Sequence, residues 1–466
     1  MMGDLTNLLE RSHRPTCEYS PVGNDSSSDD DIEDVVVFGT ARTRPKKKWC
    51  TQCGVIVVVL LFLLFLIYIP LFRNIQGRIV GIPGWSYNTS RDTTDYVFPD
   101  KNTTLIDPNM ADMENGIFLL IVVCSAANNF FARQTIRETW GNSTEFNYPY
   151  FPRMHKNFQG KYLEANFKRW REYFHDVSFS SISSSHFSST ENNASMQSDI
   201  SIRPVRIKVF FLLGQTPSNE TQSQIVVESE ISQDIIQENF LDSYNNLTLK
   251  SVMLLKWVKN NCLKRVQFVM KCDDDVFLNV PNLLHVLMGG IVPVYNDSLP
   301  FYDLTSLMAT RKHTAVVEPK RLLMGFLFCR AKPISDVTSK WYSPIYMYSG
   351  TTYPNYLSGP GYVMSTDTLA ELYSTSLKTP LFHMEDIFIT GICAHKTGLK
   401  PRHSPLFTYT AAKNLCAMRG MITQHLNSSD DIKRAYDFVT NTTINCPPPD
   451  THFNNKNLFV RTKSCK

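Results

Sequence analysis

The sequence predicts an α/β fold built around a sheet that is buried on both faces. Three segments carry this prediction, and each is an almost unbroken apolar run: residues 116–126, 206–214 and 266–272. Segments with the apolar spacing of helices follow the first two. Strands that are apolar along their whole length and alternate with helices are typical of a sheet covered by helices on both sides. We therefore expect an α/β sandwich.

The first predicted strand, GIFLLIVVCSA at residues 116–126, leads into ARQTIRETW at residues 132–140. Ile136 and Trp140 lie four residues apart in the second segment, which places them on one face of a helix. This order predicts a buried strand followed by a helix whose apolar face packs against the sheet.

The second and third predicted strands enclose another helix. RIKVFFLLG at residues 206–214 is followed by residues 228–240 and then by LTLKSVMLLKWVKNNC at residues 247–262. Trp257 and the apolar residues before it mark this last segment as a buried helix. VQFVMKC at residues 266–272 is the third strand, and three aspartates follow it directly.

Residues 54–72 form an apolar run without a charged residue. A helix of this length, at about 1.5 Å per residue, nearly matches a hydrocarbon layer of roughly 30 Å. More basic residues precede the run than follow it, which predicts a cytosolic N-terminus and a lumenal remainder. A cleaved signal peptide is disfavoured because the segment before the run is long and no cleavage site of small residues follows it. We therefore predict an uncleaved membrane anchor.

The predicted anchor separates a cytosolic part of the chain from a lumenal part. The expected parts are a cytosolic tail at 1–53, the anchor at 54–72, a lumenal stem at 73–114 and the main domain at 115–466. Two polar stretches in the main domain, near 142–203 and 296–320, are expected to be insertions.

Sequence features after the anchor fit a lumenal location. Nine N-x-Ser/Thr sequences occur there, of which Asn246 is expected to be buried. The predicted glycosylation sites are Asn88, Asn102, Asn142, Asn193, Asn219, Asn296, Asn427 and Asn441. Eight cysteines also follow the anchor, an even number that suits several disulfides. The 47 basic and 43 acidic residues give a formal charge of +4, which does not favour nucleic-acid binding.

The segment KCDDDVFLNV places Asp273, Asp274 and Asp275 at the end of a predicted buried strand. Open α/β sheets bind ligands at this edge. Three adjacent carboxylates repel one another unless a cation or solvent compensates them. Oxygen ligands suit Mg²⁺ or Mn²⁺, which also bind phosphate oxygens. We predict that these residues hold a divalent metal against a nucleotide diphosphate, with a solvated acidic turn as the alternative.

Glu385 and Asp386 precede an amphipathic helix in HMEDIFITGICAHKTG, residues 383–398. Helix capping explains an acidic residue at this position. A carboxylate at a helix N-terminus that faces a cleft also stays ionised and can accept a proton from a sugar hydroxyl. Local spacing leaves both interpretations open.

A third segment, YPNYLSGPGYVMS, combines aromatic residues with glycines. Tyr353 and Tyr356 precede Gly359 and Gly361 in this segment. Tyrosine rings can stack on sugar rings, and glycine permits close backbone approach. We predict a loop that contacts a sugar ring, with a plain hairpin turn as the alternative.

These segments, with three others, resemble the inverting β-1,3-glycosyltransferase family that contains β-1,3-galactosyltransferases and β-1,3-N-acetylglucosaminyltransferases. Six blocks follow the family's order over about residues 116–409: RQTIRETWG, FFLLGQ, residues 228–262, KCDDDVFLNV, residues 340–365 and EDIFITG. The resemblance implies a Rossmann-like GT-A fold with a single catalytic domain. It also implies a single-pass type II protein of the Golgi membrane.

The resemblance implies roles for the acidic residues. Asp273 and Asp275 match the outer members of the family's DxD motif. Asp275 is therefore expected to bind Mn²⁺, and Asp273 to reach the ribose or a metal-bound water. Asp386 matches the catalytic base, with Glu385 as the second candidate. An ordinary aspartate pKa near 4 would leave this base ionised. His403 is a guess for a further metal ligand.

Basic and acidic residues in the other blocks match residues on the side of the family's active site that binds the donor. The expected donor-binding residues are Arg133, Arg137, Asp234, Lys250 and Asp273. For Asp234 and Lys250, core packing is an equally open interpretation.

The implied reaction transfers a hexose, galactose by preference, from a UDP-sugar to the 3-hydroxyl of a glycan acceptor on protein or lipid. N-acetylglucosamine remains an alternative donor sugar. A sugar-binding or chaperone-like relative that lacks catalysis is a competing function, and a Mg²⁺-dependent phosphohydrolase is a third. The expected partners are the UDP-sugar, the acceptor, a membrane and a second copy of the chain.

Overall fold

The computed structural model describes residues 47–77, 80–114, 116–142, 206–287, 292, 320–412, 414–441, 443–447 and 465. The chain divides into two compact units, Met1–Ile67 and Tyr68–Lys466. Most of both predicted insertions, at 143–205 and 293–319, lies outside the described residues.

Helix α1 (Lys47–Gly77) contains the whole apolar run predicted as an anchor. Its side chains from Val55 to Tyr68 are exposed. Within the described part of the chain, no helix meets both the length and the apolarity that a membrane crossing requires. The membrane anchor therefore stays a prediction.

The second unit is built on an eight-stranded sheet with the order β1-β4-β3-β2-β5-β8-β7-β9. The strands are β1 (Thr104–Ile106), β2 (Ile117–Cys124), β3 (Ile207–Gln215), β4 (Ile235–Leu241), β5 (Val266–Asp273), β7 (Leu323–Phe328), β8 (Tyr356–Ser365) and β9 (Arg402–His403). A separate ribbon pairs β6 (Val276–Leu278) with β10 (Thr423–His425) in antiparallel fashion.

The three predicted strands form the centre of the sheet. β2 is buried at every residue and pairs in parallel with both β3 and β5. β4, which the sequence analysis did not separate from its neighbours, extends this parallel part beside β3. β8 then pairs with β5 in antiparallel fashion. The predicted α/β class with a sheet buried on both faces is confirmed, and the sheet is mixed.

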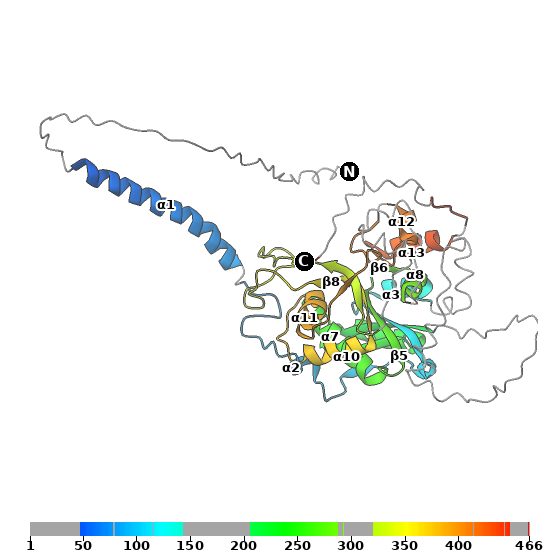
Figure 1. The fold of residues 1–466 in the computed structure, drawn as a ribbon. Helices are drawn as coiled ribbons and strands as arrows, with labels where there is room; N and C mark the ends of the chain where they lie inside the picture. The colour runs from blue at the N-terminus through cyan, green and yellow to red at the C-terminus, as the bar shows by residue number, and fades with distance from the viewer. Residues whose placement is uncertain are drawn as a thin grey trace, which may run out of the picture. The chain divides into compact units, whose positions relative to one another are not determined.

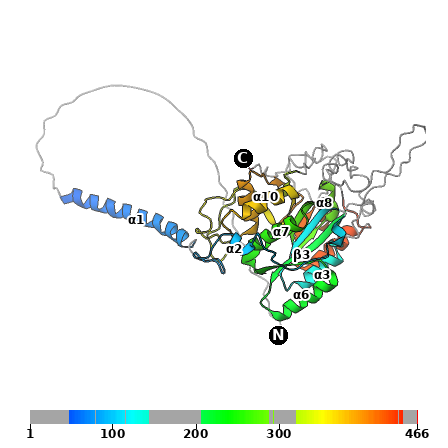
Figure 2. The same ribbon diagram turned by 90° about the horizontal axis from the view of Figure 1, so that it is seen from below.

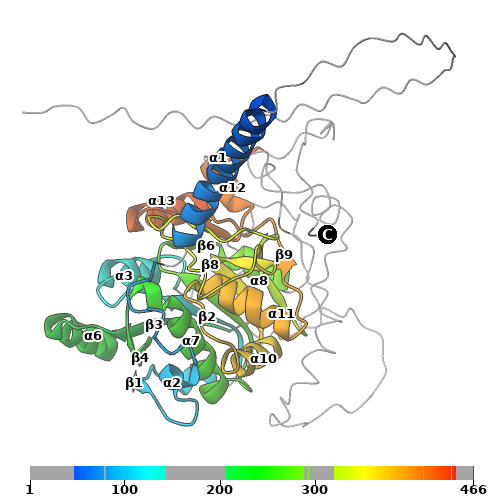
Figure 3. The ribbon, with the colours of Figure 1, turned by 90° about the vertical axis from the view of Figure 1, so that its left-hand side faces the viewer.

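Two hydrophobic cores cover the two faces of the sheet. One contains residues of α7 (Leu247–Asn261), α10 (Thr366–Ser376) and the π-helix η5 (Ile387–Cys393). The other contains residues of α8 (Val280–Leu287), α12 (Leu415–Arg419) and α13 (Ser429–Thr440), and it includes Ile136 of α3 (Phe130–Glu138). Figure 1 shows α8, α12 and α13 on one side of the strands and α7 and α10 on the other, and Figure 3 shows α12 and α13 on the side opposite α10.

The remaining elements are short or peripheral. They are α2 (Thr94–Val97), η1 (Ala111–Met113), η3 (Tyr244–Asn246), α11 (Ala394–Lys396) and α6 (Asn219–Ser232). α6 packs through Ile225 against Leu213 and Ile235, and it lies at the margin of the unit in Figure 2.

Residues 80–114, predicted as a stem, instead pack onto the main domain. Trp85 is 2% exposed and Val97 is fully buried. β1 pairs with β4, and the ammonium of Lys256 donates to the carbonyl oxygens of Val97, Phe98 and Lys101. The predicted domain boundary at 115 therefore lies too far along the chain. Isolated apolar residues among polar ones give no periodic signal that would reveal such packing.

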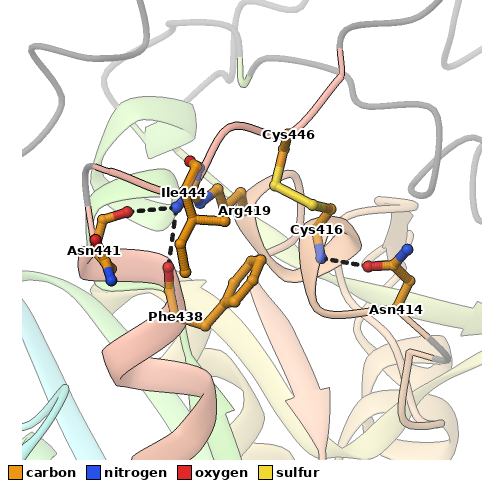
Figure 4. The surroundings of a disulfide bond; sticks show 7 residues. All are labelled: Asn414, Cys416, Arg419, Phe438, Asn441, Ile444 and Cys446. Atoms are coloured by element: carbon orange, nitrogen blue, oxygen red, sulfur yellow. Dashed lines mark hydrogen bonds between the residues drawn. A yellow bond between two sulfur atoms is a disulfide. The ribbon is translucent and has the colours of Figure 1, made fainter.

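Two disulfides occur among the described residues, Cys329–Cys465 and Cys416–Cys446. The second joins α12 to the segment after α13 (Figure 4). Arg419 reinforces the same junction by donating to the backbone oxygens of Phe438, Asn441 and Ile444. The other four cysteines that follow α1 are buried thiols: Cys124, Cys262, Cys272 and Cys393.

The predicted glycosylation sites differ in exposure. Asn88, Asn102, Asn219, Asn427 and Asn441 are exposed, and Asn142 is half-buried. Asn246, which was expected to be buried, is also only half-buried. Asn193 and Asn296 lie outside the described residues.

Candidate active site

The three aspartates lie where the central strand β5 ends. Asp273 is the last residue of β5, and Asp274 and Asp275 form the turn that leads into β6. β2 and β5 are parallel and pair in register up to Cys124 and Asp273, so the segment after β2 lies beside this turn. The predicted position of the acidic cluster at the carboxyl edge of the sheet is therefore confirmed.

Asp274 contacts the segment that follows β2. Its Oδ2 accepts hydrogen bonds from Ser125 Oγ at 2.7 Å and Asn129 Nδ2 at 2.9 Å. Ser125 Oγ also accepts a hydrogen bond from Arg133 Nη1 at 3.1 Å. These contacts use one oxygen of Asp274 to fix the loop between β2 and α3. A metal contact of Asp274 stays a prediction.

Asp275 faces a histidine of the β6–β10 ribbon. His425 Nε2 lies 3.0 Å from Asp275 Oδ2, because β10 pairs with β6 and brings His425 opposite Val276. The hydrogen bond with Asp275 raises the pKa of His425, while burial opposes this change. The other oxygen of Asp275, Oδ1, is buried without a hydrogen-bond partner in the described part of the structure. An unpaired buried carboxylate oxygen is costly, so this atom is available for a cation.

Asp273 is joined to the second acidic motif through Lys271. The Lys271 ammonium lies 2.7 Å from Asp273 Oδ1 and 3.4 Å from Glu385 Oε2, and it donates to Gly359 O at 2.7 Å. Burial raises the pKa of Asp273 to about 6, although Lys271 opposes this rise. Burial lowers the pKa of Lys271, but Asp273 and Glu385 outweigh it and raise that pKa well above its ordinary value. Lys271 thus stays protonated.

Glu385 and Asp386 stand in different environments. Glu385 is 6% exposed, and its Oε1 accepts a 2.5 Å hydrogen bond from the Tyr362 hydroxyl. Asp386 is half-buried, and its Oδ1 accepts from the backbone N–H of Ile387 at 2.8 Å. Helix capping by Asp386 is therefore confirmed, and the residue is not fully buried. Glu385 is held by its neighbours inside the protein.

The pKa of Asp386 differs from the sequence-based expectation. Burial and the neighbouring Glu385 raise it to about 7. The expectation of an ordinary value near 4 is therefore wrong. The physical reason is that desolvation and an adjacent negative charge both disfavour the ionised form. A carboxylate with such a pKa is well matched to general base chemistry near neutral pH.

Two members of the predicted sugar loop lie beside Asp386. A Cβ added at Gly359 would lie 3.6 Å from Asp386 Oδ2, so this glycine borders the carboxylate directly. Burial of the phenol raises the pKa of Tyr356, and the negative charge of Asp386 adds to this rise. Tyr356 also stacks on Phe328 with ring centroids 5.3 Å apart. Tyr356 and Gly359 both lie in strand β8, so this part of the predicted loop is a strand, and its contact with a sugar stays a prediction.

The other two members of that loop lie in the core. Tyr353 is 4% exposed and packs against Tyr348 and Phe382. A Cβ at Gly361 would come within 2.8 Å of Met270 Cε, so this glycine allows close packing of β8 on β5. Both residues support the fold at these positions, and the sequence alone did not reveal which tyrosine points inward.

The predicted donor-binding arginines form an ion-pair network behind the site. Arg133 is fully buried and lies 2.7 Å from Glu228 Oε2. Arg137 pairs with Glu228 and with Asp234, at 2.7 and 2.8 Å. The contacts of these residues are thus with the protein itself. They fix α3 to α6 and, through Arg133, support the loop that carries Ser125.

Lys250 has a similar supporting position. Its ammonium lies 2.7 Å from Asp242 Oδ1 and donates to Ser125 O at 2.8 Å. The core-packing interpretation of Lys250 and Asp234 therefore accounts for their observed contacts. A direct contact of any of these four residues with a donor stays a prediction.

His403 is placed away from the aspartates. It lies on β9, where its Nδ1 accepts a hydrogen bond from the Leu327 backbone N–H at 3.2 Å. Sequence reasoning missed His425 and Lys271. The position of Lys271, two residues before Asp273, was a usable signal because residues i and i+2 share a face of a strand. For His425 there was no local signal, since its partner is 150 residues away.

Among the described residues, no group of three or more His, Cys, Asp or Glu side chains is arranged to hold a metal. Metals that bind nucleotide phosphates often take only one or two carboxylates from the protein. Asp275 and His425 together fit that smaller protein contribution.

Comparisons with known proteins find glycosyltransferases of similar sequence. The galactosyltransferase family matches residues 189–405. β-1,3-Galactosyltransferase 1 of Mus musculus is 30% identical over 331 residues, which cover 71% of this chain and 76% of the mouse protein. The lactosylceramide 1,3-N-acetyl-β-D-glucosaminyltransferase of Xenopus tropicalis is 34% identical over 232 residues, 48% of this chain and 54% of that protein. The same-named enzyme of Rattus norvegicus is 27% identical over 322 residues, 67% of this chain and 64% of that protein.

The family match at residues 189–405 includes both acidic motifs and the strands β5 and β8. The chain therefore belongs to the β-1,3-glycosyltransferase family.

Proposed function

We propose that this chain transfers galactose from UDP-galactose to the 3-hydroxyl of a glycan acceptor, with inversion and formation of a β-1,3 linkage. The observation that carries this proposal is the joining of two acidic motifs by Lys271 at the carboxyl edge of the sheet. One motif contains Asp275 beside His425, and the other contains Asp386 with its pKa raised to about 7. The arrangement offers a site for a metal diphosphate next to a general base.

Asp275 and His425 are the residues that would hold a divalent cation, for which we propose Mn²⁺. The fit rests on the buried, unpartnered Oδ1 of Asp275 and on the 3.0 Å separation between Asp275 and His425. Carboxylate oxygens suit Mn²⁺, and a small set of protein ligands leaves positions for phosphate oxygens. When bound, the cation would neutralise the negative charge that develops on the departing UDP. Asp273 lies at the same edge, where its carboxylate can orient the ribose.

Asp386 then acts on the acceptor. Its carboxylate accepts the proton of the 3-hydroxyl while the hydroxyl oxygen forms a bond to the anomeric carbon. The bond between this carbon and the UDP oxygen breaks, and its electron pair leaves with UDP. Attack from the face opposite UDP converts an α-linked donor into a β-linked product. Tyr356 and Gly359, which border Asp386, provide a surface and space for the sugar.

UDP-N-acetylglucosamine is the second candidate donor. The 34% identity to a lactosylceramide 1,3-N-acetyl-β-D-glucosaminyltransferase favours it. The two donors differ at C2 of the sugar, and either one would meet the same metal and base.

We further propose that the protein is a type II protein of the Golgi membrane, with residues after α1 in the lumen. The apolar run at 54–72 and its basic N-terminal flank support this orientation. Exposed glycosylation sequences such as that of Asn88 agree with a lumenal domain.

A donor panel tests the proposed reaction. The purified full-length chain is incubated with UDP-galactose, UDP-N-acetylglucosamine or UDP-N-acetylgalactosamine and a set of glycan acceptors, with Mn²⁺ or with EDTA. We expect UDP release that requires acceptor and Mn²⁺, and a product whose new linkage is β-1,3 by NMR. Glu230→Gln, at an exposed position of α6, is the matched control and keeps full activity. Binding of acceptor without UDP release would support a non-catalytic sugar-binding protein, and release of phosphate from simple esters would support a phosphohydrolase.

A further inference from the structure

Lys271 is a buried lysine whose contacts reach both halves of the proposed site. It is 4% exposed, and its ammonium contacts three groups: Asp273, Glu385 and the carbonyl oxygen of Gly359. Asp273 belongs to the acidic cluster on the donor side. Glu385 and Gly359 each adjoin Asp386, the first in the chain and the second in space.

The geometry of the sheet explains why this side chain can reach both sides. Lys271 and Asp273 are two residues apart on β5 and therefore point to the same face. The antiparallel pairing of β5 with β8 places Tyr362 directly opposite Lys271. The Tyr362 hydroxyl donates to Glu385 at 2.5 Å, while Lys271 approaches the other oxygen of Glu385 at 3.4 Å. Neighbouring residues of two strands thus hold Glu385 from two directions.

The charges at this point make the lysine necessary for the local arrangement. Asp273 and Glu385 are both acidic, and without an intervening cation they would repel each other across a poorly solvated region. A single ammonium between them offsets that repulsion and satisfies the Gly359 carbonyl as well. Removal of the ammonium leaves buried charges unpaired, which displaces the groups or changes their protonation.

We propose that Lys271 is a positioning residue that fixes the donor side and the base side of the site relative to each other. It touches neither substrate nor reacting atoms. It acts through Asp273 on the nucleotide and through Glu385 and Gly359 on Asp386. This inference rests on the proposed glycosyl transfer.

The test uses one variant that removes the contacts of Lys271 on both sides and two variants that change the base side alone. Lys271→Met removes both halves, Glu385→Gln weakens the base side, and Tyr362→Phe removes the second contact to Glu385. Two readouts are compared for each variant of the full-length chain: affinity for UDP in the presence of Mn²⁺, measured by calorimetry, and kcat at saturating donor and acceptor.

Lys271→Met is expected to weaken Mn²⁺-dependent UDP affinity and to lower kcat, each by roughly 10- to 100-fold, as is typical for partners of metal-site residues. Glu385→Gln and Tyr362→Phe should lower kcat while UDP affinity stays near the wild-type value. Lys271→Arg keeps the charge and should recover part of both losses.

Lys256→Met is the matched control for a purely structural effect. Lys256 is also a buried lysine, 2% exposed, but it binds backbone oxygens of residues 97–101. We expect this control to lower the melting temperature and to leave both readouts unchanged below that temperature.

Three outcomes overturn the inference. In the first, Lys271→Met changes UDP affinity but not kcat, which would mean that the lysine acts only through its ion pair with Asp273 on the donor side. In the second, Lys256→Met lowers kcat as strongly as Lys271→Met at equal fractions of folded protein. In the third, Lys271→Met leaves both readouts unchanged. If the wild-type chain neither binds UDP with Mn²⁺ nor transfers a sugar, the proposed function itself fails, and the inference falls with it.

Discussion

His425 Nε2 lies 3.0 Å from Asp275 Oδ2, although 150 residues separate the two in the chain. The pairing of β6 with β10 creates this contact. It places an imidazole beside the carboxylate whose other oxygen is buried without a partner in the described structure. The acidic cluster is therefore completed by a residue from near the end of the folded unit.

The first prediction concerns this pair. His425→Ala should raise the Mn²⁺ concentration needed for half-maximal activity by roughly 10- to 100-fold or more. A change of that size is typical when a partner of a metal site is lost. The measurement is a Mn²⁺ titration of sugar transfer at fixed donor concentration. His403→Ala is the control, because His403 lies on β9 away from Asp275, and it should leave the Mn²⁺ dependence unchanged. An identical titration curve for His425→Ala would remove this histidine from the metal site.

The second prediction separates the base from the binding groups. Asp386→Asn should lower kcat by roughly 10²- to 10⁴-fold, the range usual for loss of a general base. UDP affinity in the presence of Mn²⁺ should stay unchanged, because the contacts of Asp386 with Ile387 and Gly359 lie on the base side of the site. Steady-state kinetics and calorimetry on the same preparations check both halves. A variant with wild-type kcat would show that another group takes the acceptor proton.

The third prediction is a pH dependence. Burial and Glu385 raise the pKa of Asp386 to about 7, and the base works only when it is ionised. Activity should therefore be full above that value and should fall about tenfold for each pH unit below it. A profile of kcat/KM against pH gives the inflection.

Glu385→Gln provides the internal check on this profile. It removes one adjacent negative charge, so the inflection should move to lower pH. A flat profile between pH 5 and 8 in the wild-type chain would contradict the role of Asp386 as the titrating base.

The fourth prediction concerns residues 80–114. Trp85 is 2% exposed, packs edge-to-face against Tyr96, and donates to the backbone oxygen of Asn245 at 2.9 Å. Trp85→Ala should destabilise the domain by about 3–5 kcal/mol, the usual cost of removing a buried aromatic side chain. Thermal unfolding of the full-length chain measures this loss. Tyr87→Ala, at a position that is 79% exposed, is the control. Equal melting temperatures for the two variants would mean that the segment is a spacer after all.

The fifth prediction concerns Asn246. Its side-chain oxygen accepts from Trp85 Nε1 at 3.2 Å, and its amide nitrogen donates to Leu241 O at 2.9 Å. Both ends of the side chain are therefore in use, and the folded protein should carry no glycan there. Asn88 and Asn219 are exposed and should be occupied. Glycopeptide mass spectrometry decides between these sites, and a fully occupied Asn246 would contradict the contacts of Trp85.

Some features of the fold were predictable because their signals are local. The apolar runs that became β2, β3 and β5 are continuous in sequence, and such runs indicate buried strands wherever they occur. β4 was not predicted because IIQENFL mixes polar and apolar residues, and it becomes a strand only beside β3. The sequence also did not reveal that Tyr353 and Gly361 of the predicted sugar loop are buried, because packing decides which residues face inward.

The sequence by itself determined which acidic residues form the site, because Asp273 to Asp275 and Asp386 lie in motifs that can be read over a few residues. Only the tertiary structure decided the partners of these residues, the contacts of Lys271 with Asp273 and Glu385, and the raised pKa of Asp386. The hydrogen-bond and ion-pair partners of these residues, and their protonation states, depend on distances and burial. Those quantities are set when segments more than a hundred residues apart pack together, and no local pattern encodes them.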